Sequence, residues 1–269
     1  MKLVKNWPGV MLLSALVATS VLSLSSALAA ERIKGQVLGA GTPIANSTVM
    51  LFAATAGAPK QLAQGKTGAD GGFTLAAPAP GKDATLYLVA RGGTPAANKA
   101  GGENPAIALM SAVGGKAPAT VTINEMTTVA SVWTHAQFLD GTAIKGHALG
   151  LKIAAGNVPN FVDLETGGWG NAIQGPLNSG QTPTMANFAT LADVLAACVT
   201  RVTPDACGKL FAASTGPAGN APADTLAAAL SIARNSWYKP ERVFALLDAF
   251  YPIRSGKTMR PVPYMPYLN

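Results

Sequence analysis

Apolar residues recur at helical spacing between residues 122 and 139, the longest such run after the N-terminal leader. This spacing predicts a helix that is buried around most of its circumference. Thr122 and Glu125 have the separation of a capping box at its start, and Asp140-Gly141 is expected to end it. The apolar positions are Met126, Val129, Ala130, Val132, Trp133, Ala136 and Leu139, and the narrow polar stripe is Asn124, Thr128, Ser131 and His135.

The segment from residue 31 to 91 has the alternating pattern of short strands separated by turn residues. Asp70-Gly71-Gly72 lies between two of these strands and indicates a tight hairpin, because Asp and Gly tolerate the positive φ that such turns need. We expect a small antiparallel β-sandwich over residues 30–91. Its strands are predicted near 33–37, 47–53, 61–67, 73–75 and 86–90.

Residues 92–103 are rich in Gly, Ala and Pro without periodicity, so they are expected to form a linker. Helical spacing dominates beyond them, and Leu149, Ile153 and Ala154 are predicted to share one helix face. Helices are expected at 105–113, 122–139, 147–163, 184–200, 205–213, 224–235 and 240–250. The predicted fold class is a multidomain β plus α protein, in which an α-helical bundle (104–252) follows the sandwich and a Pro-rich tail (253–269) ends the chain.

The first 29 residues have the organisation of a secretory signal peptide. Lys2 and Lys5 precede an apolar run that ends in small residues, which predicts cleavage between Ala29 and Ala30. The alternative is an uncleaved membrane anchor, which the many serines of the run disfavour. No later run is long and apolar enough to span a bilayer, so we expect an exported protein, periplasmic or extracellular.

The charge balance argues against nucleic acid as a partner. The chain is 49% hydrophobic and 12% charged, with a net charge of +7 that falls to +5 without the two leader lysines. Arg254, Lys257 and Arg260 form the one local basic cluster, without interleaved aromatic residues. Weak attraction to an anionic envelope polymer is one interpretation of this excess, and solubility of an exported protein is the simpler one.

Cys198 and Cys207 are the two cysteines of the chain. In an oxidising compartment such a close pair predicts a disulfide. Two cysteines and two distant histidines do not make a zinc set, and no Gly-rich phosphate fingerprint occurs, so neither a metal nor a cofactor is expected.

The N-terminal strands resemble a known family. Gly35-Gln36-Val37, the segment from Thr42 to Val49 and the segment from Thr67 to Leu75 are similar to carboxypeptidase-regulatory-like domains with a prealbumin-type sandwich. The resemblance implies a generally non-catalytic accessory module. Related adhesin modules can carry a Lys to Asn cross-link, but Lys34 has no matching Asn on the last strand, so the cross-link is not carried over.

The helical half resembles a module of exported bacterial proteins that commonly lies upstream of a β-propeller of the NHL-repeat or streptogramin-lyase-like type. The sequence departs from that pattern after the Pro-rich segment 260–267, where no propeller blades follow. Propeller-borne activity is therefore not implied for these residues. The matching segments are 105–110, 122–130, 187–198, 207–211 and 224–235.

Few residues suggest chemistry. Ser131 and His135 are four apart on one helix, so a base beside a hydroxyl is conceivable, yet without an orienting acid a structural histidine is the favoured interpretation. Asp163, Glu165 and Trp169 surround a Gly-rich loop that could bind a sugar or a cation, although a solvated loop with one anchoring aromatic explains them as well.

These patterns predict an exported, non-catalytic binding or structural module of the bacterial envelope or extracellular space, with carbohydrate as a candidate ligand. Its expected partners are an envelope polysaccharide or a β-propeller domain. One alternative is the N-terminal part of a propeller protein whose propeller is absent, and another is a carbohydrate-active or lyase enzyme. An exposed aromatic platform would favour binding, and a pocket joining His135 to a carboxylate would favour catalysis.

Overall fold

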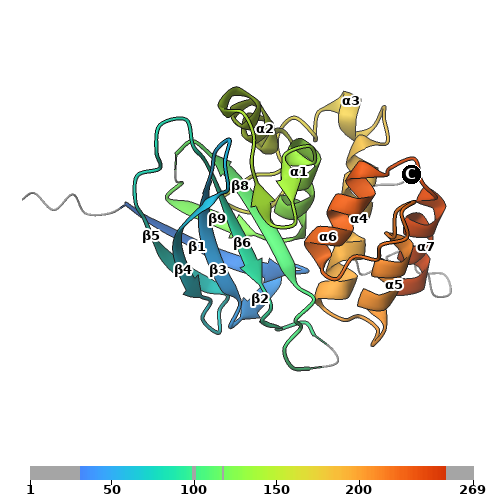
Figure 1. The fold of residues 1–269 in the computed structure, drawn as a ribbon. Helices are drawn as coiled ribbons and strands as arrows, with labels where there is room; N and C mark the ends of the chain where they lie inside the picture. Colours follow the sequence, from blue (N-terminus) through green and yellow to red (C-terminus); the bar gives the residue numbers. More distant parts are fainter. Residues whose placement is uncertain (1–30, 99–100, 117, 253–269) are drawn as a thin grey trace, which may run out of the picture.

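The computed structural model describes residues 31–98, 101–116 and 118–252. The predicted signal peptide with its cleavage site at Ala29 and Ala30, and the tail 253–269 with its basic cluster, lie outside these residues. The described chain is a mixed β and α protein with antiparallel sheets, helices and one disulfide. Strands occupy one side of the molecule and the helices within residues 184–250 the other, with the helices at residues 125–135 and 148–161 between them (Figure 1).

The strands form two main sheets. One has the order β5-β1-β2-β7, with β9 added in parallel to β1, and the other has the order β4-β3-β6-β8. The strands of the first sheet are β1 (Glu31–Gly39), β2 (Thr42–Ala45), β5 (Gly72–Ala77), β7 (Thr94–Pro95) and β9 (Thr120–Ile123). Those of the second are β3 (Thr48–Ala54), β4 (Lys60–Lys66), β6 (Thr85–Arg91) and β8 (Ala108–Gly114).

The two sheets share one hydrophobic cluster. Ile33 and Val121 of the first sheet and Leu51, Leu88 and Leu109 of the second are all fully buried in it. Alternate residues of β1, β3, β5 and β6 supply this cluster, as the period of two along a strand requires. The five strands predicted between 31 and 91 are thus confirmed, each within a few residues of its expected position.

The turn at Asp70 connects the two sheets instead of forming a hairpin. β4 before the turn belongs to one sheet and β5 after it to the other, so the predicted hairpin pairing is wrong. The local chemistry is as expected: Gly71 has a φ of +73°, and the Asp70 carboxylate accepts the amide of Gly72 at 2.9 Å. The turn residues fix the local bend, while the strand partners depend on long-range packing.

The predicted helix over 105–113 is wrong, because residues 108–114 are strand β8. Strands also occur outside the range predicted for the sandwich. β7 lies in the expected linker 92–103, and β8 and β9 lie in the range 104–252 that was expected to be helical. The segment 92–103 therefore does not separate strand-forming from helix-forming residues. The division of the chain into a sandwich domain and a helical domain stays a prediction.

The long helices after residue 140 are found where the sequence predicts them. The helices are α1 (Glu125–His135), α2 (Ala148–Phe161), α3 (Pro176–Ser179), α4 (Thr184–Val199), α5 (Ala206–Ala213), α6 (Thr225–Arg234) and α7 (Pro240–Phe250). On α2, Ala154 is buried as expected, but Leu149 and Ile153 are exposed. The buried face of α2 is formed by Leu151, Ala154, Ala155 and Val158.

Helix α1 is shorter than predicted and is capped by different residues. Asn124 is its N-cap and forms a capping box with Thr127, so the expected pairing of Thr122 with Glu125 is wrong. The helix ends at His135, and Asp140-Gly141 instead belongs to a small hairpin of β10 (Leu139–Asp140) with β11 (Ala143–Ile144). Its burial is as predicted, since Met126, Val129 and Val132 are all covered.

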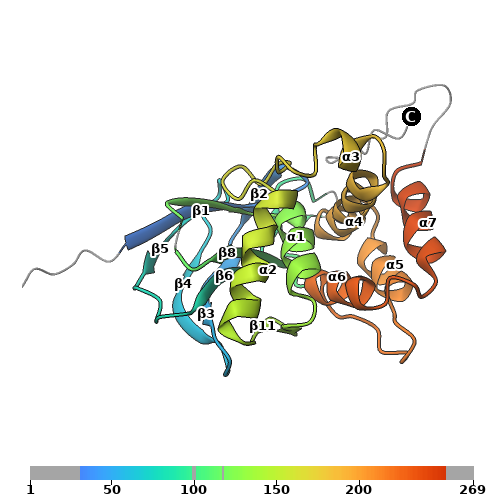
Figure 2. The same cartoon turned by 90° about the horizontal axis from the view of Figure 1, so that it is seen from above.

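The face of the second sheet that points away from the first packs against the helices. Tyr87, Val89 and Met110 of that sheet share a cluster with Val129 of α1 and Leu195 of α4. Seen from above, α1 and α2 lie between this sheet and the remaining helices (Figure 2). Sheet and helices are consequently parts of one continuous apolar core.

The predicted disulfide is confirmed. Cys198 at the end of α4 and Cys207 in the first turn of α5 are bonded, with their Cα atoms 4.4 Å apart. Asn104 reinforces the same place, because its side-chain amide donates to the carbonyl oxygens of Cys198 and Val199 at 2.8 and 3.0 Å. The disulfide therefore fixes α4 to α5, and the hydrogen bonds of Asn104 hold this junction against the segment that leads into β8.

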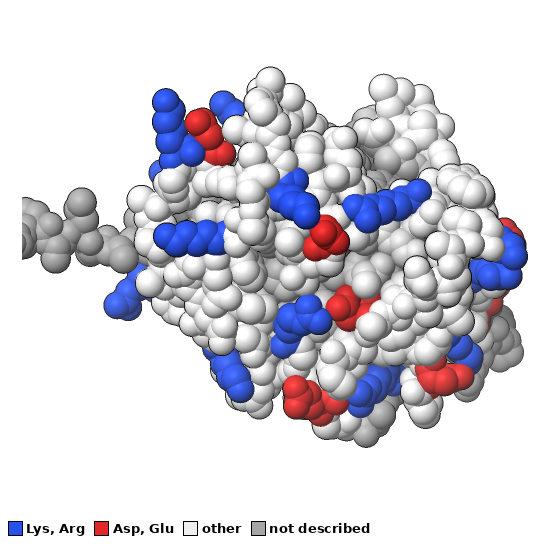
Figure 3. All heavy atoms as spheres, in the orientation of Figure 1, with Lys and Arg blue, Asp and Glu red and all other residues white. Residues whose placement is uncertain are grey.

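Within the described residues, no helix is both long and apolar enough to cross a membrane. Basic side chains are scattered over the face shown in Figure 3, and several lie beside acidic ones. Arg91, for example, pairs with Asp224 at 3.1 Å. That face carries no contiguous basic surface of the kind that nucleic acid requires.

Candidate functional site

The polar stripe of α1 faces the edge of a sheet. β8 is the last strand of its sheet, and the amides of Ala108, Met110 and Ala112 point outward from it. Three hydroxyls accept these amides: Thr225 of α6 at 3.0 Å, Thr128 of α1 at 3.0 Å and Ser131 of α1 at 2.9 Å. Helix side chains thus satisfy an edge that would otherwise expose unpaired amides.

His135 does not pair with the Ser131 hydroxyl. Its Nδ1 lies 3.0 Å from the carbonyl oxygen of Ser131, which can only accept, so Nδ1 carries the proton. Nδ1 is also 2.8 Å from the Thr134 hydroxyl, while Nε2 is buried without a hydrogen-bond partner. Burial lowers the pKa of His135 to about 4, although the bond to Ser131 opposes the shift. A fully buried ring of this kind is not positioned to act as a base on a bound molecule.

Glu125 is buried at the start of α1, where its carboxylate accepts the amide of Ala40 at 3.0 Å. A negative charge in the first turn is favourable there because of the helix dipole. Burial raises the pKa of Tyr251, and the charges of Asp193 and Glu125 raise it further. The Glu125 carboxylate is therefore a structural group of the protein interior.

The loop with Asp163, Glu165 and Trp169 is folded on itself and on α1. Asp163 accepts the amides of Thr166 and Glu165, and these bonds, with that of Thr166 the strongest, lower the pKa of its carboxyl. The loop is tied down by Thr122, whose hydroxyl donates to the carbonyl of Glu165 at 2.6 Å. Trp169 packs against Phe188 at 5.8 Å between ring centroids. The three residues lie in one loop, in which the Asp163 carboxylate is engaged by backbone amides and the Trp169 ring is packed against α4.

A large cleft opens elsewhere, among the helices. It has a volume of about 810 Å³ and is lined by residues of α1, α2, α4, α6 and α7 and of the segment after α5. This volume is typical of a site for a small organic ligand. The aromatic lining is Trp133, Phe138, Phe161, Tyr238 and Phe244, and the amide lining is Gln137, Asn157, Asn160, Asn187 and Asn235.

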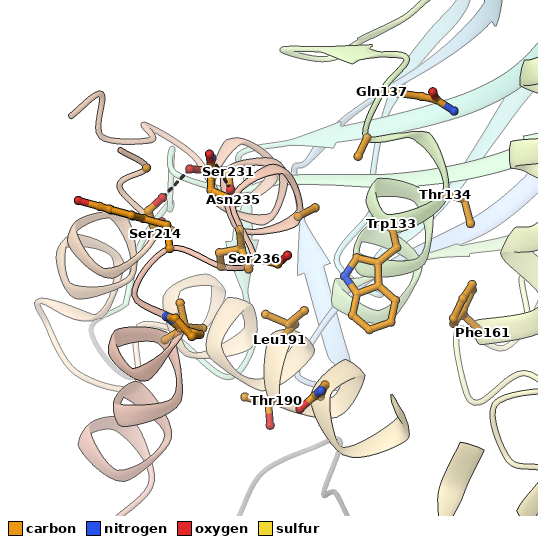
Figure 4. A pocket seen from close by; sticks show the side chains of 18 of the residues that line it. Trp133, Thr134, Gln137, Phe161, Thr190, Leu191, Ser214, Ser231, Asn235 and Ser236 are labelled. Carbon is orange, nitrogen blue, oxygen red and sulfur yellow. Dashed lines mark hydrogen bonds between the residues drawn. The ribbon is translucent and has the colours of Figure 1, made fainter. Parts of the chain in front are cut away.

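Trp133 lies in the middle of the cleft. Its ring projects from α1 between Leu191 of α4 and Phe161 at the end of α2 (Figure 4). Phe161 and Phe188 contact it edge to face, with ring centroids 5.6 and 5.3 Å away, so its orientation is fixed by packing. On one side of the indole the cleft runs between α1 and α2, and on the other it runs toward α6 and α7.

The polar side chains of the cleft fall into two groups. Ser231 and Asn235 are engaged, because the Ser231 hydroxyl donates to the Ser214 carbonyl at 2.6 Å and the Asn235 amide donates to the Ser231 carbonyl at 2.9 Å (Figure 4). Within the described chain, the side chains of Gln137, Asn187 and Thr190 make no hydrogen bond. These groups remain available to a ligand.

Among the described residues that line the cleft, none is Asp, Glu, Lys, Arg, His or Cys. The lining therefore combines aromatic and aliphatic surface with neutral hydrogen-bonding groups. No group of three or more His, Cys, Asp or Glu side chains in the described ranges could hold a metal ion. Trp133 was predicted only as a core residue of α1, so the cleft was missed.

No family model matches the sequence, and no curated protein matches it. Among solved structures, the chain has a likeness to a 9R-lipoxygenase from Cyanothece PCC8801, with 18% sequence identity and a TM-score of 0.23. The likeness covers 34% of this chain and 16% of the lipoxygenase chain. At that TM-score it carries no argument about fold or function.

Proposed function

We propose that this chain is an exported, non-catalytic binding module, and that it holds an uncharged ligand in the cleft around Trp133. The observation that carries the proposal is the composition of the cleft lining. Among the described residues, the lining offers aromatic surface and free amides and includes no charged side chain. A charged ligand buried there would lose its hydration without gaining a counter-charge, which is costly. A neutral ligand meets no such penalty.

The same lining favours binding over catalysis. General acid or base chemistry needs a group that exchanges protons near the working pH, held beside the reacting atoms. His135 was the residue considered for that role. It is fully buried and is not among the residues that line the cleft. A hydrolase or lyase that uses His135 is therefore not the function we propose.

We also infer that the strands up to β9 form the small sandwich expected from the resemblance to carboxypeptidase-regulatory-like domains, with the later helices as a bundle beside it. The shared cluster between the two sheets supports this arrangement. Export to the periplasm or the extracellular space is part of the proposal, and the bond between Cys198 and Cys207 suits an oxidising compartment. An envelope polysaccharide is the partner that fits this location.

The test uses the neutral, apolar fluorescent probe N-phenyl-1-naphthylamine and two matched variants of α2. Ile153 is 56% exposed and lines the cleft, whereas Leu149, one turn earlier, is 60% exposed and does not line it. We expect the wild type and Leu149→Arg to bind the probe, and Ile153→Arg to bind it at least about tenfold more weakly because an arginine charge would be placed at the cleft. Equal binding by both variants would place the ligand site elsewhere, and no binding by the wild type would end the proposal.

A further inference from the structure

The cleft has three properties that together restrict its ligand: its length, its central ring and its free polar groups. Lining residues lie on both sides of Trp133, with Phe161 on one side and Leu191 and Ser236 on the other (Figure 4), and they include Ile153 of α2 and Phe244 of α7. A site of this form suits an extended molecule that crosses the indole better than a single compact ring. The molecule would contact α2 at one end and α7 at the other.

The free polar groups argue against a long hydrocarbon ligand that covers them, whereas a small aromatic probe can contact the aromatic part of the lining alone. Gln137 and Asn187 contribute amides to the cleft lining, and these amides make no hydrogen bond within the described residues. Covering such groups with hydrocarbon would leave them without partners, which costs more free energy than the lost hydrogen bonds are worth. A lipid tail would incur this cost at several places along the cleft.

Charged ligands are disfavoured for the reason already given, since the described lining offers no counter-charge. The remaining chemistry is an uncharged chain with apolar faces and hydroxyl or amide groups at its edges. Pyranose rings have this form: their C–H faces stack on aromatic rings, and their equatorial hydroxyls exchange hydrogen bonds with amides. Trp133, held edge-on by Phe161 and Phe188, supplies the rigid platform for such stacking.

We propose that the cleft binds a neutral oligosaccharide, with one sugar ring stacked on Trp133 and with hydroxyls along the chain hydrogen-bonded by lining amides, those of Gln137 and Asn187. This inference rests on the proposed function, to which it adds the class of ligand. It also moves the candidate sugar site from the loop of Asp163 and Trp169, where backbone amides already engage the Asp163 carboxylate, to the helices.

The experiment titrates the full mature chain with maltotriose, cellotriose and triacetylchitotriose, using calorimetry, with trigalacturonate as the charged comparison. We expect at least one neutral trisaccharide to bind and trigalacturonate to bind at least about tenfold more weakly. The bound trisaccharide should also displace N-phenyl-1-naphthylamine. Trp133→Ala should weaken binding about tenfold by removing the stacking platform.

Two further variants keep the test decisive if Trp133→Ala does not fold. Gln137 is exposed and lines the cleft, so Gln137→Leu should weaken trisaccharide binding, while Gln181→Leu, an exposed glutamine outside the cleft, should not. Probe binding that Ile153→Arg abolishes, combined with no trisaccharide binding, would overturn the sugar assignment and leave the binding module standing. Trisaccharide binding that neither Gln137→Leu nor Trp133→Ala changes would place the sugar outside this cleft and overturn the inference.

Discussion

His135 has a different environment at each of its two ring nitrogens. Nδ1 is hydrogen-bonded to Ser131 and Thr134, and Nε2 is enclosed without a partner, so a second proton would be buried without compensation. Burial therefore lowers its pKa from 6.5 to about 4. In the unfolded chain the imidazole regains its ordinary pKa.

This difference makes the stability of the fold depend on pH. Above about pH 6.5 the ring is neutral in both states, so its contribution is complete. As the pH falls from 6.5 toward 4, only the unfolded state gains the proton, and the free energy of unfolding should fall by about 3 kcal/mol in total. Urea unfolding of the wild type and of His135→Asn at several pH values measures it. Identical pH dependence in both proteins would contradict the assignment.

The polar stripe of α1 shows how far residue-level reasoning reaches. Thr128, Ser131 and His135 were correctly predicted on one narrow face of a buried helix. Their role could not be predicted, because the partners of Thr128 and Ser131 are amides of a segment that the pattern assigned to a helix. A stripe of hydroxyls indicates a polar neighbour but does not identify it.

At the scale of elements, the edge of β8 is where helices and sheet meet. Each outward amide of the strand, at Ala108, Met110 and Ala112, has a hydroxyl partner supplied by a helix. Ser131 holds the last of these, deep in the core, and its loss would leave the amide of Ala112 buried and unpaired. Such a group costs more than the bond itself is worth.

Ser131→Ala is therefore expected to lower the free energy of unfolding by about 1 to 3 kcal/mol. Ser236→Ala is the matched control, because Ser236 is exposed and its side chain makes no hydrogen bond within the described part of the chain. Chemical denaturation compares the two variants. A Ser131→Ala protein as stable as the control would mean that α1 does not close this edge.

The helices α4 to α7 and the strand β8 show which elements the sequence could predict. Pro240 and Asp224 mark helix starts, and amphipathic spacing continues for two turns or more, so these helices were found. The run from Ala108 to Ala112 is buried on both faces and follows Pro105, which imitates the start of a helix. A short continuous apolar run has no period that could distinguish the two structures.

The whole molecule is joined by a core that runs from sheet to helices. Tyr87 and Met110 of the sheet, Val129 of α1 and Leu195 of α4 belong to one buried cluster. We expect thermal unfolding to show a single transition, with the calorimetric and van't Hoff enthalpies in agreement. Circular dichroism at wavelengths sensitive to helices, compared with tryptophan fluorescence, tests this. Two separated transitions would show instead that strands and helices unfold independently.

The cleft is formed only when several helices pack together, so the sequence did not reveal it. Its lining comes from helices far apart in the chain, from Trp133 on α1 to Phe244 on α7. No local spacing relates these residues, and each is compatible with an ordinary core or surface position. The charge-free lining is a property of the assembled helices alone.

The parallel pairing of β9 with β1 has a consequence for the order in which the chain can fold. A polypeptide leaves the ribosome with its N-terminus first, and the strand at residues 34–37 must wait for residues 120–123 before its second edge is filled. Closing a loop of that length is slow compared with forming a hairpin or a helix. During that interval the edge of β1 is open to any other strand. The nascent chain is thus most prone to aggregation before residue 123 has been synthesised, and a chaperone would protect it most at that stage.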